Sequence, residues 1–202
     1  MIKNSIQPID LTKLSKLKYA KEVTDFSNLN YYKELLNQME EICLTERAYG
    51  CAAPHFGIQE RIVLLFLKNE NNDVKAVSYF NPVILSQYGE QSGFEGTIGI
   101  SDCIGNVIRP YQVHFRAQDI HGDSIEKELY GFEAGVFCHE YDLLNGIRFT
   151  DRANNIFYLM NESTKKEMME NNPPIVFSTI GEYQDHYEKK KRYRPKQITD
   201  SF

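Results

Sequence analysis

The chain has 202 residues, of which 42% are hydrophobic and 25% charged, which suits one domain with a core of its own. We expect a single domain over residues 1–202, with its core at about 18–180. The net charge is −5, but residues 189–202 hold six basic residues and one acid, so the rest holds 17 basic and 27 acidic residues, a net of −10. Such an acidic body disfavours nucleic acid as a partner.

No stretch approaches the ~18 consecutive apolar residues of a membrane span, and no basic region followed by an apolar run opens the chain. We therefore expect a cytoplasmic protein with no membrane partner. The four cysteines show no paired CxxC spacing, so we expect buried thiols and neither disulfides nor a structural zinc site. They are Cys43, Cys51, Cys103 and Cys138.

The first half of the chain predicts an arm, a helix and two strands. Residues 1–24 lack a regular pattern and are expected to form an irregular arm. Residues 31–47 have apolar side chains at helical spacing with acids between them, which predicts an amphipathic helix. The continuous apolar run at 61–67 predicts a buried strand, and residues 74–80 predict the next strand after a polar turn.

The second half predicts a hairpin and a central helix. Residues 111–117 and 124–129 flank His121-Gly122-Asp123, which is typical of a β-hairpin. A helix is expected over 131–145, ended by Gly146 in a left-handed cap. Further on we expect a helix at 161–170, an edge strand at 175–180, and a solvated basic tail at 189–202.

One stretch of that central helix carries a possible catalytic motif. His139-Glu140 begins like the His-Glu-x-x-His helix of metal hydrolases, in which two His four residues apart share a face and hold a metal. The fifth position here is Leu143, which has no lone pair to donate. The usual pair of imidazole ligands is therefore absent, and His-Glu by itself is a weak signal.

Two upstream stretches give the motif a context. They are Ala48-Tyr49-Gly50-Cys51-Ala52-Ala53-Pro54-His55 and Glu95-Gly96-Thr97-Ile98-Gly99. With the helix, their order and spacing resemble the peptide deformylases, whose motifs read Gly-x-Gly-Leu-Ala-Ala-Pro-Gln, Glu-Gly-Cys-Leu-Ser and Gln-His-Glu-x-Asp-His. The resemblance runs from about residue 18 to 151. It implies an α+β fold in which antiparallel sheets surround a central helix with the His-Glu motif, and a cleft where Gly50, Thr97, His139 and Glu140 meet.

The resemblance also implies three metal ligands, and this chain keeps one of them. The family's Cys position is Thr97, its first His is His139, and its second His is Leu143. A neutral hydroxyl is a poor ligand for zinc or ferrous iron, and metal affinity needs several donors acting together. We therefore expect no metal cofactor.

The remaining candidate residues are assigned by position in the motifs. Glu140 retains the place of the general base, and His55 stands where the family has the Gln that polarises the scissile carbonyl. If Glu140 lies in a dry pocket beside Leu143, burial should raise its pKa. The ligand-binding set is then Gly50, Cys51, Thr97, Ile98 and Leu143, with Glu140, His55 and His139 as catalytic candidates.

Three functions remain open on this basis. The first is a protein without deformylase activity, whose cleft binds a peptide-like or acyl-amino-acid ligand or a partner enzyme in an accessory role. The second is a metal-free enzyme acting on an amide or acyl group, with Glu140, His139 and His55 as acid or base groups and Cys51 or Cys103 as nucleophile. The third is an active deformylase with zinc or iron on unorthodox ligands such as His55, His139 and Cys103.

Overall fold

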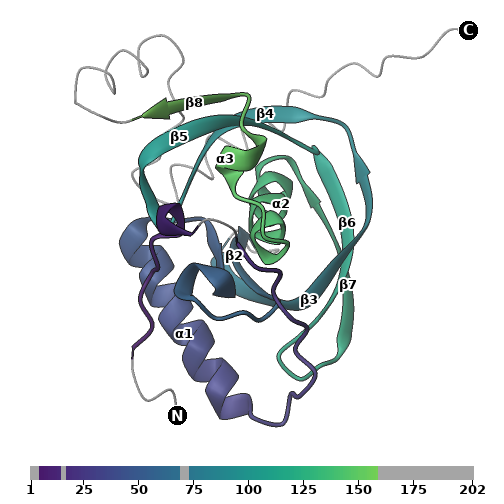
Figure 1. The fold of residues 1–202 in the computed structure, drawn as a ribbon. Coiled ribbons are helices and arrows are strands. Elements are labelled where there is room, and N and C mark those ends of the chain that lie inside the picture. The colour runs from purple at the N-terminus through teal and green to yellow at the C-terminus, as the bar shows by residue number, and fades with distance from the viewer. Residues whose placement is uncertain (1–4, 15–16, 69–72, 159–202) are drawn as a thin grey trace, which may run out of the picture.

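The computed structural model describes residues 5–14, 17–68 and 73–158 (Figure 1). The helix expected at 161–170, the strand at 175–180 and the basic tail lie outside these residues. In the described part of the chain, no helix is both long and apolar enough to cross a membrane.

Two antiparallel sheets form the framework. The five-stranded sheet has the order β1-β2-β3-β6-β7, and the three-stranded sheet has the order β4-β5-β8. The strands are β1 Gly50–Ala52, β2 Ile62–Lys68, β3 Val74–Tyr88, β4 Gln91–Thr97, β5 Ile100–Arg109, β6 Gln112–Gln118, β7 Ser124–Tyr130 and β8 Asn155–Tyr158. The hairpin expected around residues 121–123 is confirmed, because β6 and β7 pair from Gln112↔Tyr130 to Gln118↔Ser124.

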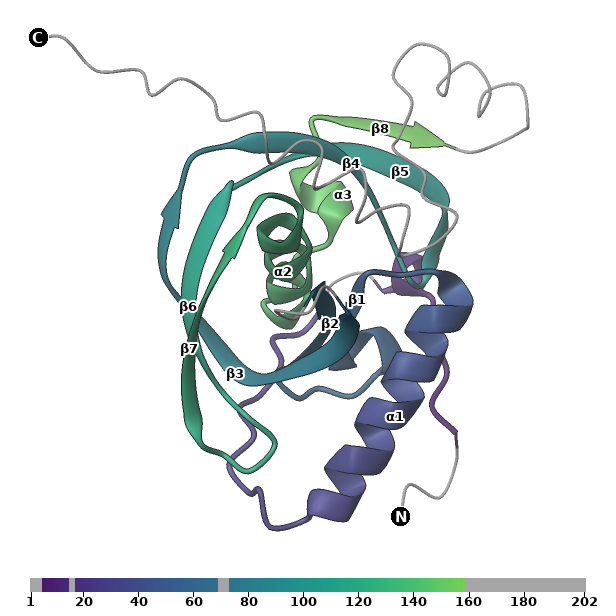
Figure 2. The ribbon, with the colours of Figure 1, turned by 180° about the vertical axis from the view of Figure 1, so that it is seen from behind.

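The helix that carries the His-Glu motif, α2 Gly131–Leu144, lies inside this framework. Figures 1 and 2 show the strands curving around α2, while the helix α1 Leu29–Glu46 lies outside, beyond β2. This confirms the expected α+β fold with antiparallel sheets around a central helix. Gly146, at φ 76°, ends α2 as expected, since the N–H groups of Gly146 and Ile147 bond back to the carbonyls of Leu143 and Asp142.

The continuous apolar run of β2 follows from the burial of both its faces. Val63 and Leu65 belong to the core around α2, whereas Ile62 and Leu64 belong to a second core beneath α1. Successive side chains of a strand point to opposite faces, so a strand between two cores needs apolar residues throughout. In the described residues of the arm, the regular features are the short 3-10 helix Leu11–Lys13 and an isolated parallel bridge between Lys21 and Glu60.

Two expectations for the strands need correction. We predicted that the second strand would end at Phe80, but β3 continues to Tyr88 past a bulge at Asn81, whose φ is 49°. The Asn81 amide binds the backbone of Val23 and the side chain of Gln118, which replaces the ladder bonds lost at the bulge. We also did not predict β8 or the β4–β5 hairpin. In the hairpin, Gly93, Gly96 and Gly105 interrupt the apolar pattern of the two strands.

Candidate functional site

Three candidate residues meet where three elements come together. His55 lies in the 3-10 helix Ala53–Phe56 after β1, Thr97 ends β4, and Glu140 lies on α2. The Nε2 atom of His55 is 2.7 Å from the Thr97 hydroxyl, and its Nδ1 atom is 3.7 Å from Oε2 of Glu140. His55 and Glu140 are buried, whereas Thr97 is half-buried. The imidazole therefore lies behind Thr97 and between it and the carboxyl.

The N-terminal arm holds the two loops that position this pair. The Ile9 N–H donates to the carbonyl of His55 at 2.8 Å, and the Leu11 N–H donates to the carbonyl of Gly99 at 3.0 Å. Gly99 forms the β4–β5 turn at φ 83°, and a Cβ there would come within 2.3 Å of the Ile9 carbonyl oxygen. Only glycine permits this packing, so the arm fixes His55 relative to Thr97.

Glu140 is a buried carboxyl with an incomplete set of hydrogen bonds. Its Oε2 atom has no hydrogen-bond partner among the described residues. Burial raises the pKa of the carboxyl to about 7, although the neighbouring His139 opposes this. The expectation that a dry environment would raise the pKa is thus confirmed.

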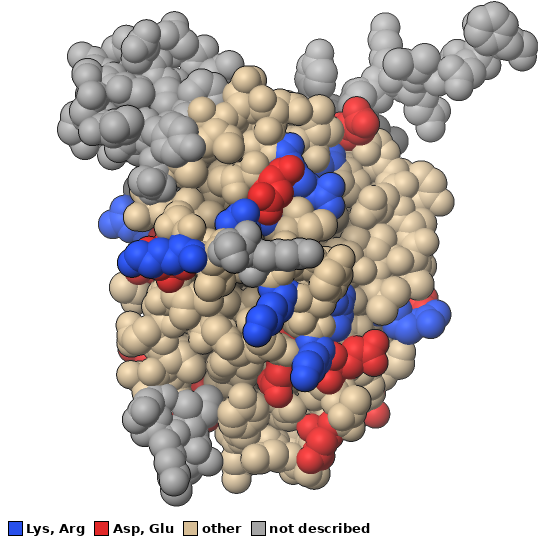
Figure 3. All heavy atoms as spheres, viewed as in Figure 1, with Lys and Arg blue, Asp and Glu red and all other residues tan. Residues whose placement is uncertain are grey.

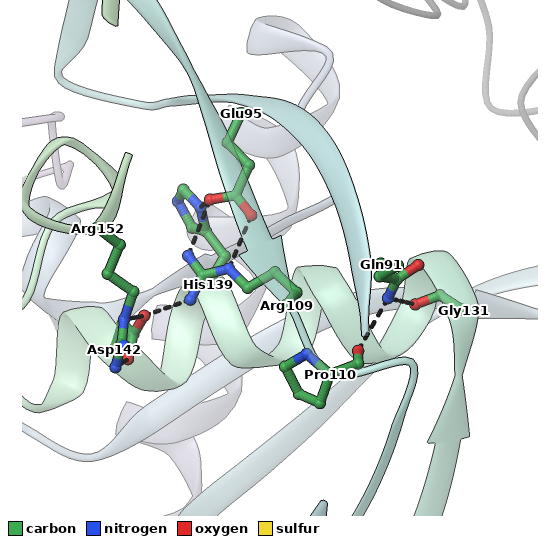
Figure 4. Close-up of polar contacts among 8 residues, drawn as sticks. All are labelled: Gln91, Glu95, Arg109, Pro110, Gly131, His139, Asp142 and Arg152. Carbon is green, nitrogen blue, oxygen red and sulfur yellow. Dashed lines mark hydrogen bonds and ion pairs between the residues drawn. The ribbon is translucent and has the colours of Figure 1, made fainter. Parts of the chain in front are cut away.

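His139 contacts a buried ionic network formed by Glu95, Arg109, Asp142 and Arg152 (Figure 4). Its Nδ1 atom lies 2.8 Å from Glu95, and both Glu95 oxygens accept hydrogen bonds of 2.8 Å from Arg109. Arg109 also donates to Asp142, which in turn is bound by Arg152. The network links β4, β5 and α2, and Gln91 adds a second tie by donating to the carbonyls of Pro110 and Gly131.

Our sequence reasoning missed Glu95 and Arg109 as parts of the site. Burial alone would raise the pKa of the Glu95 carboxyl, but hydrogen bonds from Arg109 and His139 outweigh it and hold the pKa at about 2. The sequence did offer a signal for the acidic part of this network. Glu95 opens the second motif, and Asp142 is retained in the third. Arg109 had no signal, since no motif includes it.

The structure shows how two residues of the first motif pack. A Cβ at Gly50 would lie 2.7 Å from the Leu65 side chain and 3.1 Å from Val136 of α2. Its small size serves packing between β1, β2 and α2. Cys51 points to the other face of β1, where its thiol is fully buried near the Met39 carbonyl. Its pKa is raised well above the usual value by burial, so it has neither the access nor the acidity of a nucleophile.

Leu143 and Ile98 are also buried, and Leu143 packs in the core around α2. All four cysteines are buried thiols, as expected. The chain folds back after Thr97 at Gly99, and Cys103 lies on β5 opposite Tyr158. Within the described ranges, no three His, Cys, Asp or Glu side chains are grouped so that they could hold a metal. His55, His139 and Cys103 thus do not form such a group in this part of the chain.

The donors at the motif positions do not fit a catalytic transition metal. His139 still has a carboxylate on its Nδ1 atom, which is the usual way to orient a metal-bound imidazole. The other two positions offer a hydroxyl that is hydrogen-bonded to His55 and an apolar side chain in the core. One imidazole with a neutral hydroxyl is short of the three protein ligands of such sites.

Comparisons with known proteins agree with this fold. The family model described as polypeptide deformylase matches residues 14–158. A peptide deformylase of Heliobacterium modesticaldum is 36% identical over 137 residues, covering 67% of this chain and 85% of that protein. A protein of Staphylococcus epidermidis described as peptide deformylase-like is 31% identical over 140 residues, covering 69% and 82%.

Solved structures give the same result. A probable peptide deformylase from Synechococcus phage S-SSM7 superposes with a TM-score of 0.67 at 28% identity, covering 73% of this chain and 99% of that one. A class I type b peptide deformylase of Acinetobacter baumannii, bound to Met-Ala-Ser, has a TM-score of 0.61 at 31% identity, covering 68% and 90%. This chain belongs to the peptide deformylase family.

Proposed function

We propose that this family member binds an uncharged peptide-like or acyl-amino-acid ligand without a metal, in an accessory role beside a partner enzyme in the cytoplasm. The observation that carries the proposal is the 2.7 Å hydrogen bond between His55 and Thr97. It occupies the hydroxyl that stands at one ligand position, while Leu143 at another packs in the core. Metal-dependent deformylation would need both positions as donors.

Two strand edges support a peptide-like ligand. Among the described strands, β1 pairs with β2 alone and β4 pairs with β5 alone. An extended peptide can add to such an edge through main-chain hydrogen bonds. The relative from Acinetobacter baumannii was solved with the tripeptide Met-Ala-Ser bound, which supports a ligand of this class.

The charges around the site favour an uncharged ligand. Glu140 has an unpartnered oxygen, Glu95 lies on the far side of His139, and Leu143 supplies an apolar wall. An anionic head that normally coordinates a metal would meet the Glu140 carboxyl here instead. On the face shown in Figure 3, Lys and Arg side chains stand beside Asp and Glu without forming one continuous basic surface, which is consistent with a ligand other than nucleic acid.

A pair of matched ligands tests this proposal. We expect a peptide hydroxamate to bind no more tightly than the corresponding peptide amide, because the proposed site has no metal for the hydroxamate to coordinate. Calorimetry with both compounds on the untagged protein measures the two affinities. A preference of about 100-fold or more for the hydroxamate, about 2.7 kcal/mol, would show that a metal is bound and would overturn the proposal.

A further inference from the structure

We propose that Thr97 is an acyl-accepting nucleophile and that His55 is its general base. This inference rests on the proposed metal-free site and adds a covalent step to it. The Thr97 hydroxyl lies 2.7 Å from Nε2 of His55, and Nδ1 of the same ring faces Oε2 of Glu140 at 3.7 Å. Hydroxyl, imidazole and carboxyl thus follow one another in the order used by hydroxyl nucleophiles in acyl transfer.

The hydrogen bonds of Nδ1 determine which way the proton can move. Nδ1 lies 3.2 Å from the Ala52 carbonyl oxygen and 3.1 Å from the Ala52 nitrogen, so either ring tautomer has a backbone partner. The unpartnered Glu140 oxygen on the same side favours a proton on Nδ1. In that tautomer Nε2 carries the lone pair and accepts from the Thr97 hydroxyl.

Burial arranges the pair for reaction with a ligand from outside. Thr97 is half-buried at the end of β4, whereas His55 is 1% exposed behind it. A ligand on the β4 edge would therefore meet the hydroxyl before the imidazole. The Ile98 amide follows Thr97 directly, which is where many acyl-transfer enzymes place an oxyanion donor.

The reaction is an acyl transfer that needs no metal and no redox partner. The Thr97 oxygen bonds to the acyl carbon while His55 Nε2 takes the hydroxyl proton. The bond from that carbon to the amine or alcohol leaving group then breaks, and the leaving group departs with the proton from His55. Water attacks the Thr97 ester, with its proton passing to Nε2 and then to the Thr97 oxygen, and releases the carboxylic acid.

Burial and the nearby His139 also limit the rate. Together they lower the pKa of His55 to about 3, so the imidazole is a weak base. Glu140 facing Nδ1 favours the imidazolium that forms during attack and acts as a positioning residue. We therefore expect slow acylation by a reactive ester and still slower reaction of an amide.

Acylation by p-nitrophenyl acetate tests the inference. The untagged full chain should take up one acetyl group, which peptide mapping after acid quenching places on Thr97. Thr97→Ser should keep the acetylation, and Thr97→Val should abolish it at this position. Thr45→Val is the matched control, since the exposed Thr45 hydroxyl donates to the Glu41 carbonyl of its own helix. It should react like the unmodified protein.

His55→Gln separates catalysis from structure. Gln can still hydrogen-bond the Thr97 hydroxyl but cannot take its proton, so we expect acetylation of residue 97 to slow by about 100-fold or more. Equal rates in this variant, or acetyl groups on lysines only, would overturn the inference. Such a result with unchanged affinity for the peptide amide would leave the proposed function intact. A metal in the unmodified protein would instead overturn the proposed function itself.

Discussion

The combined changes Thr97→Cys, Leu143→His and His55→Gln are expected to convert a chain without bound metal into one that holds close to an equivalent of zinc or iron. Leu143 lies one turn after His139, so a His there shares its face of α2. A thiolate at residue 97 supplies the third donor, and removing His55 frees that position from its present hydrogen bond. The Glu95 carboxylate is already hydrogen-bonded to Nδ1 of His139 and would orient this imidazole towards a metal.

The expected gain in affinity is several orders of magnitude, because three deprotonated donors act together where one imidazole now stands alone. Elemental analysis of the dialysed variant measures it. The same variant with Thr97→Ser in place of Thr97→Cys is the control, since it keeps both imidazoles but lacks the thiolate. Deformylation of a formyl-methionyl peptide should be recovered less completely than metal binding, because the residues that surround the ligands have also changed. A folded triple variant without metal would show that residues 97 and 143 are not ligand positions.

Arg109→Met should be among the most destabilising single changes in the described chain. Arg109 is 5% exposed and donates to both Glu95 and Asp142, so its removal leaves buried carboxylates without their main partner. Breaking one side of a buried ionic network costs about 3–5 kcal/mol of unfolding free energy. Urea unfolding of both proteins at neutral pH measures the difference.

Arg116→Met is the control for Arg109→Met, because Arg116 pairs with Glu126 on the surface, where the two side chains are 57% and 47% exposed. We expect it to cost at most about 1 kcal/mol. Glu95 adds a pH signature, since a carboxyl whose folded pKa is about 2 and whose ordinary value is 4.5 stabilises the fold above pH 4.5. That contribution disappears as the pH falls towards 2 in the unmodified protein, and Arg109→Met should lack this part of the loss. Equal costs for the two Arg variants would contradict the role of the network.

Much of the fold could be predicted because the patterns of α2, α1, β2 and the β6–β7 hairpin agree with their packing. The apolar run of β2 reflects two cores, and Gly146 ends α2 where it was expected. The bulge at Asn81 could not be predicted, since it depends on hydrogen bonds to Val23 and Gln118, which are far away in the sequence. The hairpin of β4 and β5 could not be predicted for a similar reason, because Gly105 packs against Phe149 of α3 Phe149–Arg152 and Gly99 packs against Ile9 and Leu11 of the arm.

The motifs identified His55, Thr97, His139 and Glu140 as candidate site residues. The structure places His55 between Thr97 and Glu140. The sequence could not show that the hydroxyl and the imidazole bond each other, because 42 residues separate them. Nor could it show which face of β1 Cys51 occupies. For a strand of three residues, the side-chain alternation can be read in either direction until its neighbours are known.

The metal content of the unmodified protein tests the central claim most directly. The chain should be prepared without chelator and without affinity-tag histidines, and its zinc, iron and nickel measured by elemental analysis. We expect less than about a tenth of an equivalent in total, because a single imidazole binds such metals weakly. A stoichiometric transition metal, with deformylation of a formyl-methionyl peptide that chelator abolishes, would contradict the account.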